Sequence, residues 1–197
     1  MIGVGDCVAR LIKLSEERRR LAQVSPTVPI AWWRRFVAEF FAPSALLLYD
    51  ALSSSAAPGG AAGYARLLRA RFSGVGGIKD ERLLLENPCE FLLQSGVIVV
   101  DCPRAIFLSE YASSRVHSEG HLRVSFAARD RKIVCWEFSS RSHVELLDRA
   151  ALTPGAPLPP SAVCAFGHSP ALTRLMLTFP SASDGGNTFG GPRVWRS

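Results

Sequence analysis

The first third of the chain carries apolar side chains at helical spacing. Residues 5–23 and 64–72 each present one apolar and one charged face, so both are predicted to be helices. Between them lies an aromatic stripe over residues 30–41 that repeats every three or four positions: Trp33, Phe36, Val37, Phe40 and Phe41. We interpret this stripe as core packing, because aromatic side chains at this spacing bury a large apolar area.

After residue 80 the period changes from 3.6 to two, which predicts strands. The expected strands cover residues 45–52, 82–86, 97–102, 110–117, 121–128 and 133–138. A tight turn at 118–120 is expected to join two of them as a hairpin. Ser142–Glu145 has the form of a capping box and predicts a helix to about residue 152. Helices followed by an antiparallel meander predict an α+β fold, with helices covering one sheet face.

The alternation gives the expected sheet two different faces. The face toward the helices is expected to form the structural core with the aromatic stripe: Trp33, Phe36, Phe40, Val124, Phe126, Trp136 and Phe138. The opposite face is expected to carry a half-apolar set: Val97, Val99, Arg123, Ile133, Cys135 and Glu137. A sheet face that meets only water is normally more polar. We therefore predict that this outer face forms a dimer interface with a second copy.

The expected domain covers residues 5–152, and the pattern then changes. Residues 153–168 are rich in Pro, Gly and Ala and are expected to form a linker. A short amphipathic helix is expected within residues 169–180, with an apolar stripe made of Leu172, Leu175, Met176 and Phe179. Residues 181–197 are rich in Ser and Gly and are expected to be disordered.

The composition is that of an ordinary globular protein, 48% hydrophobic and 20% charged in 197 residues. No apolar run approaches the ~20 residues of a membrane-spanning helix, so no membrane association is expected. The net charge is +6, but the arginines are scattered, so direct nucleic-acid binding is not expected. The five cysteines form no Cys-x-x-Cys pair. Neither a disulfide framework nor a zinc site is therefore indicated, and an intracellular compartment is expected.

No group of residues has a catalytic spacing. His117 and His121 flank the expected turn and are interpreted as solvated side chains. Asp101 and Cys102 lie on an expected strand, where no motif places a base beside the thiol. The glycines within residues 74–77 follow a helix and lack the Lys-Ser/Thr of a phosphate loop. We therefore expect no catalytic residue, no metal and no cofactor.

Several sequence blocks in one order resemble a known family. Residues 33–43 read Trp-Arg-Arg-Phe-Val-Ala-Glu-Phe-Phe-Ala-Pro. Residues 121–126 and 132–138 supply two strand-like blocks, the second ending in Trp-Glu-Phe, and residues 141–147 read Arg-Ser-His-Val-Glu-Leu-Leu. Together these blocks resemble the LIM-domain-binding (Chip/LIM-domain-binding/SEUSS) transcriptional adaptors, most of all the plant SEUSS-like branch.

The resemblance implies a dimerisation domain shaped as a nuclear transport factor 2-like cone, in which helices pack in a curved antiparallel sheet. It also implies a nuclear, non-enzymatic adaptor that forms homodimers, or heterodimers with family relatives, and does not itself bind DNA. Such adaptors bridge DNA-bound transcription factors to co-regulators of the LEUNIG or single-stranded-DNA-binding-protein type.

The co-regulator-binding segment of the family is matched only at its start. Residues 165–172 resemble the opening of that segment, and neither its remainder nor a LIM-interaction tail follows. We therefore expect a truncated form that dimerises but binds co-regulators weakly or not at all. The expected contact residues are Leu172, Leu175, Met176 and Phe179.

The same cone elsewhere holds small-molecule sites and isomerase-like active sites, so an enzyme is the alternative function. An enzyme should place Asp, His or Tyr on core-facing positions, whereas those positions are read here as apolar. An inward carboxylate with a raised pKa would favour the enzyme.

Overall fold

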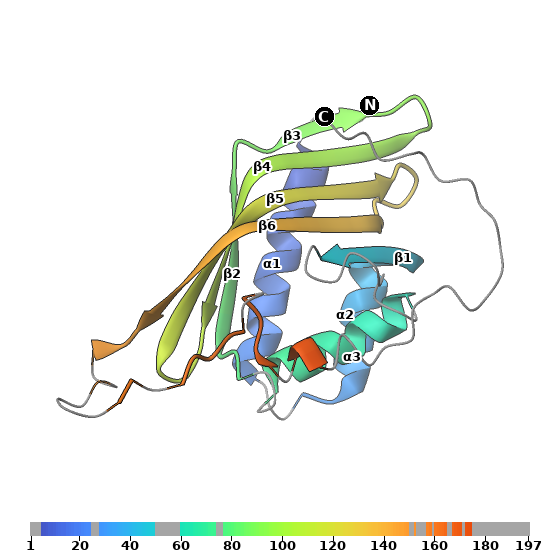
Figure 1. Cartoon of the computed structure of the whole chain (residues 1–197). Helices are drawn as coiled ribbons and strands as arrows, with labels where there is room; N and C mark the ends of the chain where they lie inside the picture. The colour runs from blue at the N-terminus through green and yellow to red at the C-terminus, as the bar shows by residue number, and fades with distance from the viewer. Residues whose placement is uncertain are drawn as a thin grey trace.

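The computed structural model describes residues 5–24, 28–49, 60–73, 77–149, 152, 157–158, 160–164, 167–170 and 172–174. Within them, helices come first and most strands follow (Figure 1). The elements in chain order are α1 (Asp6–Val24), α2 (Ile30–Phe40), β1 (Phe41–Tyr49), α3 (Gly60–Phe72), β2 (Asp80–Glu86), β3 (Cys89–Leu92), β4 (Val97–Glu110), β5 (Ser114–Ala127) and β6 (Ile133–Leu147). The expected α+β class is confirmed.

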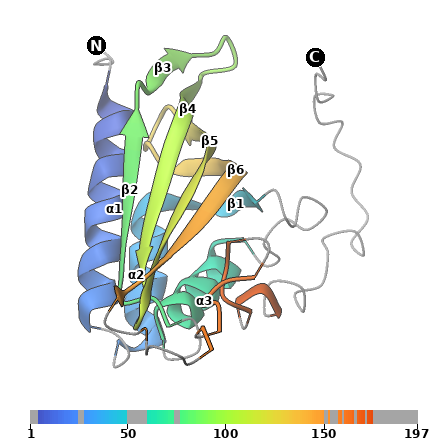
Figure 2. The ribbon, with the colours of Figure 1, turned by 60° about the vertical axis from the view of Figure 1, so that its left-hand side comes forward.

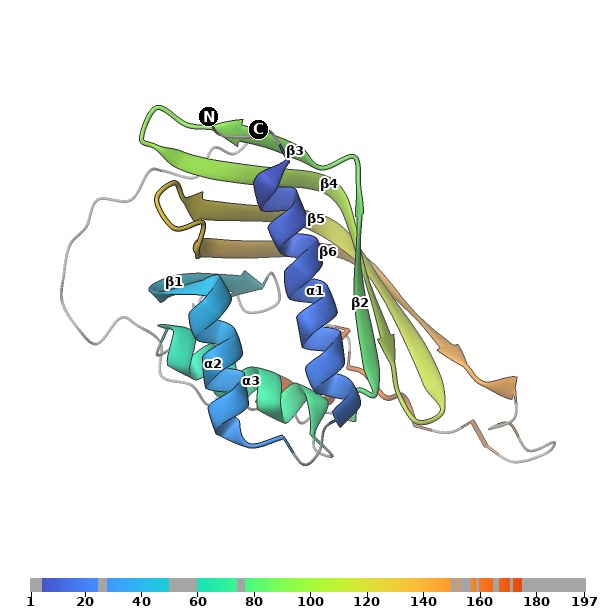
Figure 3. The ribbon, with the colours of Figure 1, turned by 180° about the vertical axis from the view of Figure 1, so that it is seen from behind.

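The helices lie on the concave side of a strongly curved sheet, which confirms the expected packing of helices in a curved sheet (Figures 1 and 3). In Figure 2, α1 runs along β2 at the edge of this sheet. α3 begins at Gly60, four residues before its expected start, because the alanines at 61 and 62 extend the helix. Trp33 of α2 stacks on Phe72 of α3 with ring centroids 5.5 Å apart, which joins the two helices.

The sheet has the strand order β1-β6-β5-β4-β2, with β3 also paired to β4. β2 pairs with the second half of β4, and β3 pairs with its first half. β1 and β6 are parallel, whereas all other described pairs are antiparallel. The expected sheet was wholly antiparallel. The difference arises because α3 and four strands separate β1 from β6, which gives the long connection that a parallel pair needs.

The expected hairpin turn at 118–120 is wrong, because β5 runs unbroken through it. Gly120 is buried inside the sheet, where an added Cβ would lie 2.2 Å from the backbone oxygen of Ser139 and 2.8 Å from the Phe138 ring. The pairing with β6 shifts register at this glycine. Gly120 therefore serves a close approach of two strands at a bulge and not a turn.

The expected helix at Ser142–Glu145 is also wrong, because β6 continues to Leu147. Ser142 pairs with Glu119 of β5, and Glu145 pairs with Val116. The Glu145 carboxylate accepts a hydrogen bond from the backbone N–H of Ala162, 2.9 Å away, instead of capping a helix. Long-range pairing thus outweighs the local capping signal.

The main core lies between the helices and the concave face of the sheet. All seven residues of the expected core are buried there: Trp33, Phe36, Phe40, Val124, Phe126, Trp136 and Phe138. Phe107 meets Phe138 edge-on with ring centroids 4.9 Å apart. The period-two alternation of the sheet therefore places the aromatic side chains toward the helices.

Candidate functional site

A buried carboxylate lies on the helix-facing side of the sheet, on the edge strand β2. Glu81 of β2 is 0% exposed. Its Oε2 lies 3.0 Å from Arg18 Nη2, and its Oε1 accepts hydrogen bonds from Arg71 Nε at 2.9 Å and Ser109 Oγ at 3.1 Å. The Arg18 guanidinium also lies over the Phe107 ring, 5.4 Å from its centroid. α1, α3, β2 and β4 therefore meet at one buried ionic cluster, which we call the Glu81 cluster.

The Glu81 carboxylate is negatively charged and lies between two positively charged arginine side chains. Burial alone would raise the pKa of the Glu81 carboxyl, but the charges of Arg18 and Arg71 outweigh burial and lower the pKa to about 2. The carboxyl is therefore ionised at neutral pH and already engaged by two guanidinium groups. An inward carboxylate with a raised pKa would have favoured an enzyme, and Glu81 has the opposite shift.

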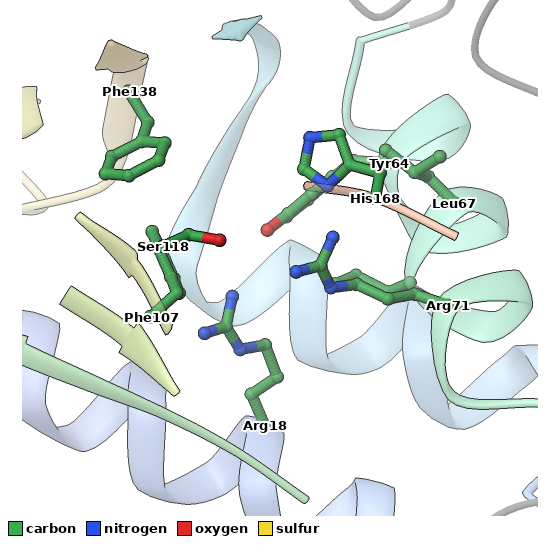
Figure 4. A pocket seen from close by; sticks show the side chains of 9 residues that line it. Arg18, Tyr64, Leu67, Arg71, Phe107, Ser118, Phe138 and His168 are labelled. Atoms are coloured by element: carbon green, nitrogen blue, oxygen red, sulfur yellow. The ribbon is translucent and has the colours of Figure 1, made fainter. Parts of the chain in front are cut away.

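The last described residues, within 160–174, lie beside α3, and one of their side chains points into the interior (Figures 1 and 4). The His168 side chain enters a small cavity together with the Arg18, Arg71, Tyr64 and Ser118 side chains. Gly167, with φ +72°, adopts a left-handed backbone conformation, and the His168 carbonyl accepts a hydrogen bond from the N–H of Cys164 at 2.8 Å. This turn aims the imidazole inward.

The expected linker and exposed helix need correction. Val163 and Leu172 are 7% and 1% exposed, and Leu172 belongs to the main core cluster. The described part of residues 160–174 therefore packs on the domain, and Leu172 is no exposed co-regulator contact. Burial of Leu172 in this cluster supplies hydrophobic free energy that holds the segment on the domain. Leu175, Met176, Phe179 and residues 181–197 lie outside the described residues.

The cavity beside His168 has a volume of about 20 Å³. That is room for about one water molecule, whereas small-molecule sites occupy roughly 300–1,000 Å³. Polar groups do face the interior, as an enzyme would require, but the cavity that the described residues form beside His168 is too small for a substrate.

The free energy of unfolding should decrease on acidification because of His168. Burial, followed by the charge of Arg71, lowers the pKa of His168 to about 3 from its ordinary 6.5. A lowered histidine pKa stabilises the fold above the unfolded value of 6.5, and this contribution decreases as the pH falls toward 3. The side chain is partly exposed, so we expect a reduced loss of about 1–2 kcal/mol between pH 7 and pH 5.

Urea unfolding at pH 7 and pH 5 measures this loss. We expect His168→Gln to reduce the pH dependence by about 1–2 kcal/mol, while His117→Gln, at an exposed position on β5, leaves it unchanged. Equal pH dependences in all three proteins would show that His168 protonates in the folded state as it does in the unfolded one.

The outer face of the sheet contains a row of paired positions across five strands, which we call the apolar row. Phe91 pairs with Val99, Val99 with Ser125, Ser125 with Cys135, and Cys135 with Leu46. Phe91 and Leu46 are 39% and 50% exposed, whereas Val99 is already buried. Burial raises the pKa of the half-buried Cys135 thiol, so that side chain is neutral at physiological pH.

A charged row runs beside the apolar row. Asp101 pairs with Arg123, and Arg123 pairs with Glu137. Asp101 Oδ1 lies 3.0 Å from His121 Nε2 and 3.6 Å from Arg123 Nε. Acidic and basic groups thus alternate on one face, an arrangement that a second copy could complement.

The structure brings most of the expected outer set together. Val97, Val99, Arg123, Cys135 and Glu137 lie on strands β4, β5 and β6 with the spacing expected. The position of Ile133 is wrong: it is 0% exposed and belongs to the main core cluster.

A register shift explains the burial of Ile133. Phe126 pairs with Ile133, but Ser125 pairs with Cys135, so Val134 is the extra residue of a bulge. Ile133 therefore faces inward with Phe126. Counting back from the inward-facing Trp136 in steps of two predicts that Val134 faces inward and Ile133 faces outward. The bulge reverses this prediction for Ile133.

Sequence reasoning also missed Leu46, Phe91 and the Glu81 cluster. β3 is only four residues long, and nothing in the sequence identifies β6 as the partner of β1. A signal for Glu81 did exist, since it shares the inward phase of Leu83 and Leu85 on β2. Arg18 similarly follows Leu11 and Leu14 at helical spacing, and all three are buried.

Among the described residues, no group of three or more His, Cys, Asp or Glu side chains could hold a metal ion. No helix in the described part of the chain is long and apolar enough to cross a membrane.

Comparison with known proteins gives a family match. The family model described as LIM-domain binding protein matches residues 10–173. The probable transcriptional regulator SLK2 of Arabidopsis thaliana is 34% identical over 178 residues, which cover 75% of this chain and 21% of that protein. The transcriptional corepressor SEUSS of the same plant is 31% identical over 150 residues, covering 64% and 17%. The chain thus spans about a fifth of the length of these relatives.

Solved structures match the fold. The Kfla4162 protein from Kribbella flavida aligns with a TM-score of 0.52 at 9% identity, covering 70% of this chain and 92% of that chain. At this identity the similarity shows the fold alone. The family match ends within the described C-terminal residues, as expected if they are part of the domain.

Proposed function

Because the chain belongs to the LIM-domain-binding protein family, we propose that it is a non-enzymatic transcriptional co-regulator adaptor that acts as a dimer. The observation that carries the proposal is the apolar row on the outer face of the sheet, with exposed Phe91 and Leu46 at its two ends. In this proposal the domain supplies a dimer platform, and DNA-bound transcription factors and co-regulators are its protein partners. The nucleus is the proposed compartment, because the relatives are named transcriptional regulators.

Two such faces pack together in the proposed dimer. Burial of the apolar row supplies hydrophobic free energy, and the adjacent charged row fixes the orientation of the copies. In a two-fold dimer both copies use the same surface. A family relative with a similar surface can therefore take the place of one copy and form a heterodimer.

The non-enzymatic role is supported by the Glu81 cluster and by the small size of the cavity beside His168. The Glu81 carboxylate is held by two arginines, and the cavity beside His168 has room for about one water molecule. An isomerase-like reaction is the alternative and would require the C-terminal residues to leave the cone.

Direct nucleic-acid binding is not part of the proposal. Several of the arginines are paired with carboxylates: Arg18 and Arg71 with Glu81, Arg19 and Arg82 with Asp80, and Arg104 with Glu86 and Glu119. Paired guanidinium groups are less available for phosphates.

Co-regulators of the LEUNIG or single-stranded-DNA-binding-protein type are the proposed but weak partners. Leu172 is used in the core of the domain, which leaves only Leu175, Met176 and Phe179 of the expected stripe for such a contact. One short apolar stripe offers less area than the ~800 Å² per partner of a standard interface.

The dimer is the part of the proposal that can be tested first. At micromolar concentration the full chain should scatter light as a species of twice its 21.4 kDa mass. Leu46→Arg and Cys135→Arg should each shift the protein toward monomer, because each places an unpaired charge in the proposed contact.

Ile12→Arg provides the matched control, since Ile12 is 51% exposed on α1 and away from the apolar row. It should leave the dimer intact. A monomeric unmodified chain, or a dimer that resists both substitutions in the row, would rule out this interface.

A further inference from the structure

A second surface, on the helical side of the molecule, has the form of a binding groove. It lies where α2, α3, the start of β1 and the turn between β5 and β6 come together, and its volume is about 320 Å³. Figure 3 shows α2 and α3 side by side below β1. The lining residues are Arg34, Val37, Ala38, Phe41, Pro43, Ala61, Ala62 and Lys132. None of them belongs to the apolar row, so we treat this groove as independent of the proposed dimer.

The floor of the groove is apolar, and its walls are made of short side chains. Val37 and Phe41 are 1% exposed and form a fixed floor, because they are also part of the main core. Ala38, Pro43 and Ala62 are exposed along the walls. Short side chains let an incoming backbone come close, and the open walls suit an extended chain better than an enclosed small molecule.

The charge of the groove has one sign. Arg34 of α2 and Lys132 of the β5–β6 turn are the charged lining residues, and no acidic side chain is among the described residues that line the groove. Among the described residues, neither cation forms an ion pair. A partner that places carboxylates at these two cations gains both attraction and orientation.

We propose that this groove binds an extended segment of a partner protein in which aliphatic side chains are flanked by Asp or Glu. The aliphatic side chains lie on the floor made by Val37 and Phe41, and the carboxylates meet Arg34 and Lys132. The net charge of +6 favours encounter with such acidic segments. The adaptor then has a peptide-binding surface that stays accessible when the sheet faces are paired.

The test uses the full chain and a fluorescent peptide, acetyl-Glu-Asp-Leu-Leu-Asp-Glu-amide, in fluorescence polarisation at physiological salt. A dissociation constant on the order of 100 μM is expected for a peptide of this size. The double variant Arg34→Glu, Lys132→Glu should weaken binding at least about tenfold. Ala62→Phe, which fills the groove without a charge change, should weaken binding to a similar extent.

The matched control is Arg35→Glu, Arg69→Glu, which changes the net charge equally at exposed positions of the same two helices outside the groove. It should retain the affinity within about twofold. An equal loss in this control would show that binding is non-specific attraction to a basic protein, and would overturn the proposal. Undetectable binding of the peptide at 1 mM would do the same.

Two further outcomes identify a different occupant, and each also overturns the proposal. Stronger peptide binding after Asp50, Ala51 and Leu52 are replaced by Gly-Ser-Gly would mean that the chain's own connecting segment fills the groove. Saturable binding of decanoate, lost in Ala62→Phe while the peptide does not bind, would indicate a lipid-like anion. Light scattering of the same samples reports the dimer separately, so failure of the groove is distinguishable from failure of the proposed function.

Discussion

Glu81→Gln is expected to destabilise the fold by about 3–5 kcal/mol, because it removes the carboxylate charge that faces the buried Arg18 guanidinium. Arg18 is 2% exposed, and the Arg71 side chain is 15% exposed. The Arg18 guanidinium therefore cannot reach water unless α1 moves. Urea unfolding followed by tryptophan fluorescence measures the loss, since both Trp33 and Trp136 are buried in the core.

Glu119→Gln is the matched control. Glu119 also pairs with an arginine, Arg104, but both side chains are at least one-third exposed, so little change is expected. Replacing Glu81, Arg18 and Arg71 together by Leu, Met and Met should recover stability relative to Glu81→Gln, because no charge is then left unpaired. If Glu81→Gln behaved like Glu119→Gln, the Glu81 cluster would not hold the helices to the sheet.

Ending the chain after residue 159 is the second change with a large expected effect. It removes Val163 and Leu172 from their buried positions and His168 from the cavity that it lines. The loss of a buried leucine alone typically costs about 2–5 kcal/mol, and we expect at least that decrease in the free energy of unfolding. A chain that ends after Arg174 keeps every described contact and should unfold like the full protein.

Comparing these two truncated chains also distinguishes a loss of folding stability from a loss of co-regulator binding. A deletion of residues 165–180 removes both the core residue Leu172 and the expected co-regulator contacts Leu175, Met176 and Phe179. Lost binding in such a variant would have two explanations. If the chain ending after residue 159 unfolds like the chain ending after Arg174, the C-terminal residues are a separate tail and the original assignment of a linker is right.

The sequence patterns that could be interpreted correctly are those set by local periodicity. The stripe from Trp33 to Phe40 and the alternation from Leu122 to Phe126 each repeat with the period of their own element. Their burial therefore follows without knowledge of the partner. All of these apolar positions are in the core.

The errors share a different cause, which is pairing between distant strands. Gly120 signals a turn in isolation, but in the sheet it allows Phe138 and Ser139 to approach β5. Ile133 faces inward because a bulge at the next residue changes the phase of β6. The apolar row depends on Phe91 and Leu46, whose neighbours are set by β4 and β6. Register of this kind is a tertiary property, so one sequence without its partners does not specify it.

The parallel pairing of β1 with β6 has a consequence during synthesis on the ribosome. Phe41 pairs with Ile133, about 90 residues later in the chain. At about 5–20 residues per second, the ribosome needs roughly 5–20 s to make that stretch. Throughout this interval the aromatic stripe of α2 lacks the sheet that will cover it. The nascent chain is thus expected to expose a large apolar surface that is prone to aggregation. It should depend on chaperones until β6, and then Leu172, have been synthesised.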